Sequence, residues 1–116
     1  MANTFKVKTN DAMPTSAGTP LTLYTVPSST TTVVLGLMLC NVDTSQRLVD
    51  VHIESDTSDT ETNANVELVT NAPIPAGGSL ETLGGGKLVL QTTDVLKVTS
   101  DTASSIDVAL SIMEIT

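Results

Sequence analysis

Apolar and polar residues alternate along most of the chain in short runs, and no window of a dozen residues keeps the three-and-four spacing of a helix. The clearest alternating runs lie at 21–27, 48–54 and 105–116, with turn residues between them. These runs predict strands. The inward positions predicted in the last two are Val49, Val51, Ile53, Ile106, Val108, Leu110 and Ile112.

The most apolar segment is 31–42, which alternation divides into two faces: Val33, Leu35, Leu37 and Leu39 on one, and Val34, Met38, Cys40 and Val42 on the other. A strand that is apolar on both faces is typical of a central strand covered by two layers. A buried helix is the alternative, but Gly36 and the β-branched start favour a strand. A single small sandwich covers both faces of such a strand only in part, so we expect neighbouring copies of the chain to cover the rest.

Further strands are predicted at 4–8, 65–70, 87–91 and 94–100, with an extended connector at 71–79. Roughly seven to nine strands at spacings of about ten residues are typical of a sandwich or jelly roll. A length of 116 residues supports one core. We therefore predict an all-β, antiparallel β-sandwich or jelly-roll-like fold, in a single domain over 19–116 after an extended arm over 1–18.

Composition agrees with this fold, since the chain has 20 Thr, a β-branched residue, and only 2% aromatic residues. Few aromatics disfavour sites that stack rings. A formal charge of -8 disfavours nucleic acid as a partner, because phosphate backbones are repelled. No apolar run reaches 18 residues and the first residues lack a signal peptide's features, so we expect a soluble chain made in the cytoplasm, with no membrane partner.

The predicted arm over 1–18 carries two of the five basic residues, Lys6 and Lys8. Such an arm is able to add a strand to the sheet edge of a neighbouring subunit. A frayed terminus is the alternative interpretation.

Two residues are candidates for nucleophilic or metal chemistry. His52 is the only histidine, and its strand phase places it on a polar face between Asp50 and Glu54. A pair with Cys40, the only cysteine, requires the two strands to be neighbours. Since Cys40 ends the most apolar strand, we expect its thiol to be covered and inert.

Two loops are candidates for ligand binding. Asp56, Asp59 and Glu61 lie in the acidic segment 55–65 and are able to bind calcium, although the twelve-residue calcium loop is absent and a solvated loop is the simpler interpretation. The GGGK run at 84–87 lacks the spacing of a phosphate loop and predicts a turn. We therefore assign no catalytic, cofactor-binding or metal residues, expect no cofactor, and predict that the chain is not an enzyme.

The order of several segments resembles small structural proteins of tailed bacteriophages, especially cyanophage-like ones. These segments are TLYTVPSSTTTVV, CNVDTSQRLVDVHI, NAPIPAGGSLETLGGGKLVLQTTDVLKVTS and SSIDVALSIMEI, with a late Glu in the last strand. The resemblance covers 19–116. The acidic segment 55–65 and the 18-residue leader depart from the pattern.

The resemblance implies a non-enzymatic virion component, a head decoration or cement protein that bridges coat subunits. The alternatives are a tail, neck or fibre-base module of the virion and a small ligand- or carbohydrate-binding sandwich. The implied partners are the major capsid protein or other virion subunits. A homo-oligomer is expected, with a trimer favoured, and the location is the virion.

Overall fold

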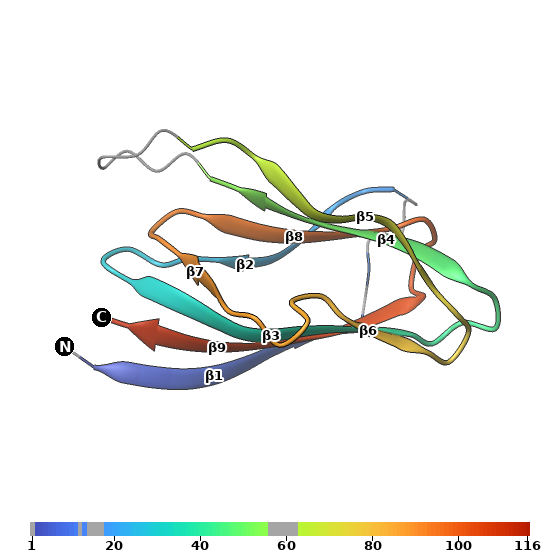
Figure 1. Ribbon diagram of the computed structural model, residues 1–116, viewed down its shortest axis with the longest axis horizontal. Helices are drawn as coiled ribbons and strands as arrows, with labels where there is room; N and C mark the ends of the chain where they lie inside the picture. Colours follow the sequence, from blue (N-terminus) through green and yellow to red (C-terminus); the bar gives the residue numbers. More distant parts are fainter. Residues whose placement is uncertain (1, 12, 14–17, 56–62) are drawn as a thin grey trace.

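The computed structural model describes residues 2–11, 13, 18–55 and 63–116, which form two antiparallel sheets packed face to face (Figure 1). Sheet A has the order β1-β9-β3-β6, and β7 also pairs with β3, whereas sheet B has the order β2-β8-β4-β5. The strands of the described residues are β1 (Asn3–Asn10), β2 (Leu21–Thr25), β3 (Thr31–Asn41), β4 (Arg47–Glu54), β5 (Val66–Ile74), β6 (Ser79–Glu81), β7 (Leu88–Leu90), β8 (Val95–Ser100) and β9 (Ile106–Ile115).

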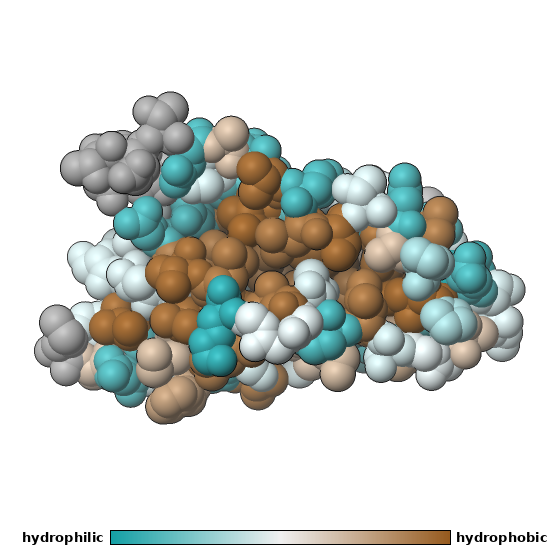
Figure 2. Space-filling model, viewed as in Figure 1, coloured by the Kyte–Doolittle hydropathy of each residue, from teal (hydrophilic) through white to brown (hydrophobic). Residues whose placement is uncertain are grey.

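The all-β sandwich predicted from the sequence is confirmed. Figure 2 shows hydrophobic side chains gathered along the middle of the molecule, where the two sheets meet. The inward positions predicted in β4 and β9 are buried, with Leu110 and Val51 fully so. No helix of the described residues is long and apolar enough to cross a membrane.

The prediction that β3 is apolar and covered on both faces is wrong. The register of β3 against β9 shifts between Val34 and Gly36, as a β-bulge does, and this shift reverses the faces of the strand. Val34 is therefore buried before the bulge and Leu37 and Leu39 after it, while Met38 stays 44% exposed. One face of β3 lies in the core, and no layer of the described chain covers the other.

Two other predictions of strand detail are corrected. In β2 a register shift between Thr22 and Tyr24 buries both Leu23 and Tyr24, which simple alternation places on opposite faces. The connector predicted at 71–79 begins only after Ile74, because β5 continues through Pro73. A proline is tolerated there since β5 is an edge strand.

The first strand, β1, lies within the segment predicted to be an arm. It pairs with β9 along its whole length, from Asn3 opposite Ile115 to Asn10 opposite Val108. In this structure residues 3–10 therefore form an edge of the chain's own sheet A, with every residue up to Thr9 exposed.

Candidate functional site

The residues suspected of nucleophilic chemistry lie on opposite sides of the molecule. Cys40 is in β3 of sheet A and His52 is in β4 of sheet B, so the pair conceived from the sequence does not form. His52 lies beside Glu54, with Nε2 3.2 Å from Oε2, and Glu54 also contacts Lys97. Cys40 is only partly buried, on the outward face of β3, because the bulge turned it away from the core.

The suspected ligand loops give no built site in the described residues. Asp56, Asp59 and Glu61 lie outside the residues that the structure describes. Among the described residues no group of three or more histidine, cysteine, aspartate or glutamate side chains is placed to hold a metal ion. The GGGK run forms a turn, as predicted, in which Gly84 and Gly85 have φ values of 60° and 87°.

A buried polar network links the two sheets where β1, β9, β3 and β2 meet. The Tyr24 hydroxyl donates to Glu114 Oε2 at 2.6 Å and lies 2.8 Å from the hydroxyl of Thr32. Lys6 completes the network, with Nζ 2.7 Å from Glu114 Oε1. Lys8 lies over the ring of Tyr24, 5.9 Å from its centroid.

The network favours an ionised carboxylate and a neutral phenol. Hydrogen bonds from Lys6 and then Tyr24 hold the pKa of Glu114 below its usual range. Burial, followed by the hydrogen bond to Glu114, raises the pKa of Tyr24 to about 12. The bonds of Glu114 to Lys6 of β1 and to Tyr24 of β2 therefore tie both strands to β9.

The pattern of apolar and polar residues does not predict this network. The late Glu in the last strand was the one available signal, and nothing in the pattern connected Glu114 with Tyr24, 90 positions earlier. Tyr24 reaches Glu114 because the register shift in β2 turns the side chain of Tyr24 inward.

The outward face of sheet A carries an apolar row that crosses four strands. Phe5 of β1 is opposite Met113 of β9, Met113 is opposite Val33 of β3, and Val33 is opposite Val89 of β7. Phe5 is 71% and Val89 is 60% exposed. The next row runs from Val7, which is 66% exposed, through Ser111 to Gly36, where Glu81 Oε1 lies 3.8 Å from the position that a Cβ on Gly36 would occupy. Such a patch marks an interaction surface.

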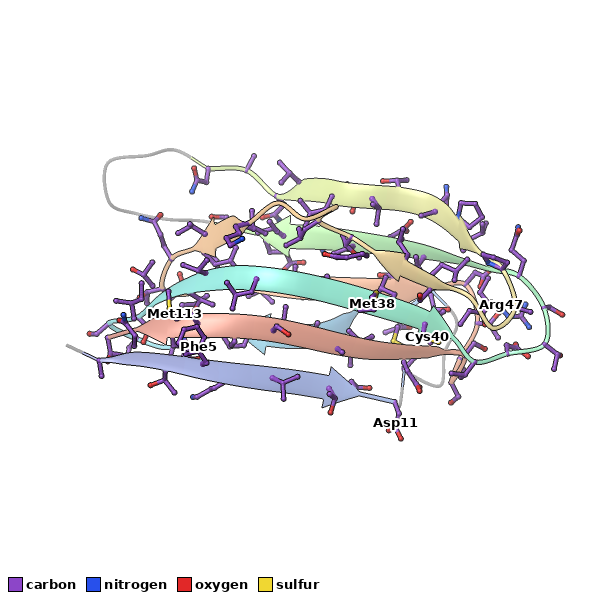
Figure 3. All side chains as sticks on the ribbon, turned by 60° about the horizontal axis from the view of Figure 1, so that its bottom comes forward. Phe5, Asp11, Met38, Cys40, Arg47 and Met113 are labelled. Atoms are coloured by element: carbon purple, nitrogen blue, oxygen red, sulfur yellow. The ribbon has the colours of Figure 1, made fainter. Side chains whose placement is uncertain are left out.

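The other end of the same face is hollowed. A depression of ≈ 420 Å³ is lined by Thr9 and Asp11, by Met38 and Cys40, and by Asp107 and Ala109. Figure 3 shows Phe5 and Met113 together at one end of sheet A, and Met38, Cys40 and Asp11 toward the other. The face therefore joins an apolar knob to a shallow hollow with two carboxylates.

No family of known proteins matches the chain, and no curated protein matches it in sequence. Solved structures share its fold. In the T13 viral particle of infectious bursal disease virus, the match has a TM-score of 0.59 at 15% identity and covers 97% of this chain and 30% of that one. In the VP2 subviral particle of the same virus, the TM-score is 0.51 at 13% identity, and the match covers 97% of this chain and 32% of that one. In the structure of the Gx strain of the virus, the TM-score is 0.53 at 12% identity, and the match covers 96% of this chain and 32% of that one.

The chain thus has a sandwich fold that also occurs as a part of the subunits of virus particles. It spans about a third of the length of the chains that it matches. At these identities the likeness concerns the fold alone.

Proposed function

We propose that this protein is a non-enzymatic structural protein of a virion and serves as a decoration or cement protein on the head of a tailed bacteriophage. The observation that carries the proposal is the fold match, since nearly the whole chain superposes on a domain of a viral particle at a TM-score of 0.59. The outward face of sheet A, which no layer of the described chain covers, also supports the proposal. An assembly protein needs such a docking surface.

In this role the protein bridges neighbouring subunits of the major capsid protein. A cement protein binds the assembled lattice and not its separated parts, and this preference stabilises the assembled state. The location is the virion, after synthesis in the cytoplasm of the host. A homo-oligomer suits a lattice with rotational symmetry, and a trimer is the form favoured from the sequence.

Counting copies per particle tests the proposal. Quantitative mass spectrometry of virions of the phage that encodes this chain should find copies on the order of the coat protein count, because decoration follows the lattice. A tail, neck or fibre-base module forms a symmetric ring of only about three to twelve copies. A count in that lower range refutes the head position, and absence from the particle refutes the virion role.

Particle stability provides a second measurement. Heads assembled without the protein should open at a lower temperature than complete heads, and adding the purified chain should restore the difference. Equal opening temperatures would contradict a cement function.

A further inference from the structure

We infer that copies of this chain exchange β1, so that the β9 edge of one copy binds β1 of a neighbouring copy. The neighbour then supplies the Lys6 that binds the buried carboxylate of Glu114. The inference goes beyond the proposed virion role and does not depend on it. It rests on the separability of β1, on a binding site for β1 that other strands build, and on charge.

Strand β1 is separable from the rest of the fold. Every residue from Asn3 to Thr9 is exposed, and no residue of β1 belongs to the buried core, which begins with Met13. Because burial of apolar surface is the main source of stability, the core stays closed when β1 leaves. What holds β1 is its pairing with β9 and the bond of Lys6 to Glu114.

The binding site for β1 is built without β1. Glu114 of β9 has a side chain that is 9% exposed, and its Oε2 accepts a hydrogen bond from the hydroxyl of Tyr24 in β2. That hydroxyl also lies 2.8 Å from the hydroxyl of Thr32 in β3. Three other strands therefore fix the carboxylate, while its Oε1 receives the cation. The β9 edge and Glu114 together form a socket for an extended segment with a lysine at one position, and we call it the β1 socket.

Charge and sequence select β1 of a second copy as the occupant. β1 carries Lys6 and Lys8 and no carboxylate, which is a charge of +2, and the whole chain has a formal charge of -8, so the rest of the chain carries -10. The acidic body of any copy therefore attracts this basic strand. No other strand of the described residues contains two lysines. Identical sequence also gives identical pairing with β9.

Exchange keeps every contact that β1 makes in its own sheet. An exchanged β1 again places Lys6 against Glu114, and Lys8 again lies over the ring of Tyr24. Each copy gives one strand and receives one, so the exchange closes into a ring of copies and adds no strand to the outer edge of β1. Swapping of an identical element in this way is a low-cost route to a homo-oligomer.

The closed monomer competes with exchange. Within one copy the chain itself holds β1 near its socket, at an effective concentration in roughly the millimolar range. Exchange should therefore be populated at about millimolar protein concentration. It should persist after dilution, because reversal requires β1 to leave the sheet of the neighbour.

Disulfide trapping between two different chains tests the inference. Val7 of β1 is opposite Ser111 of β9, and both side chains are exposed. In a Cys40→Ser background, a Val7→Cys chain and a Ser111→Cys chain are mixed at about millimolar concentration and oxidised. Exchange sets the two cysteines opposite one another at a distance that suits a disulfide. A mixed pair with twice the mass of 12.0 kDa should therefore form.

Thr9→Cys replaces Val7→Cys in the matched control. Thr9 is exposed on the same strand, but it is opposite Ala109 and not Ser111. Collision between exposed faces links both cysteines to the Ser111→Cys chain equally, whereas strand pairing links only Val7→Cys. Circular dichroism confirms that each variant is folded. The inference is overturned if the Val7→Cys mixture gives no mixed pair, or if the two mixtures link equally.

Dissociation kinetics test the role of Lys6 in chains without added cysteines. Wild-type oligomer formed at about millimolar concentration should return slowly to monomer after dilution, as sedimentation measures. Lys6→Ala should speed this return several-fold, whereas Lys87→Ala, which removes an exposed lysine outside β1, should leave the rate unchanged. A wild type that stays monomeric, or equal rates in the two lysine variants, also overturns the inference. Binding to capsids is measured separately, so failure of the cement proposal leaves these results intact.

Discussion

Replacing Tyr24 with phenylalanine tests the network that holds β1 and β2 to the sandwich. The ring of Tyr24 is 5% exposed and keeps its volume in the variant, so packing is preserved. What is lost is the 2.6 Å hydrogen bond to Glu114 and the 2.8 Å contact with Thr32. The carboxylate then retains Lys6 as its partner, and the hydroxyl of Thr32 loses this partner in a buried position.

The magnitude follows from the charge on Glu114. A hydrogen bond to a charged group contributes about 1.5–3 kcal/mol, so the free energy of unfolding should fall by about 2–3 kcal/mol. An unfolding entropy of roughly 2.1 cal/mol/K per residue gives about 0.24 kcal/mol/K for this chain, which converts the loss to a decrease in Tm of about 8–12 °C.

Urea denaturation followed by circular dichroism measures the free energy, and a thermal scan measures Tm. Thr44→Val is the control, because it removes an exposed hydroxyl that lies 3.4 Å from Asp43, and it should change stability by less than about 0.5 kcal/mol. If Tyr24→Phe proves as stable as this control, the network does not hold the sheets together.

Three further predictions concern other parts of the molecule. Between pH 10 and 12 the phenol of Tyr24 ionises in the unfolded chain but stays neutral in the fold, so stability should fall as pH rises there, and less so in Tyr24→Phe when urea midpoints are compared. Leu110→Ala should cost about 2–5 kcal/mol by urea denaturation, because Leu110 is fully buried. Cys40 should react with a thiol reagent in the native monomer, since it is partly exposed, and full protection of the native thiol would show that β3 faces the other way.

Alternation predicted the fold well where strands run without interruption. In β4 and β9 the two-residue period assigned every predicted inward residue correctly. Neither strand has an extra residue inserted between those inward positions. In β3 one inserted residue near Gly36 exchanged the faces, and an alternating pattern contains no mark of where such an insertion occurs. The predicted covered strand thus became a strand with an open face.

The candidate surface was beyond sequence reasoning for the same reason. Its apolar row joins residues of β1, β3, β7 and β9, and only the register places Phe5 in line with Val89. The network around Glu114 also depends on long-range pairing, since its members come from three separate parts of the chain. Composition disfavoured a site that stacks rings, but it gave no position for an interface.

Strand β1 forms an edge of sheet A, and its lysines oppose pairing with a further strand. β1 is an edge strand, and an exposed edge is a template for adding further strands. Lys6 and Lys8 alternate with the outward Phe5 and Val7 and therefore turn toward the sandwich, where Lys6 binds Glu114. Inward charges of this kind oppose edge pairing, because an added strand would have to cover them. Removal of β1 from sheet A would also break the bond of Lys6 to Glu114, whose side chain is 9% exposed.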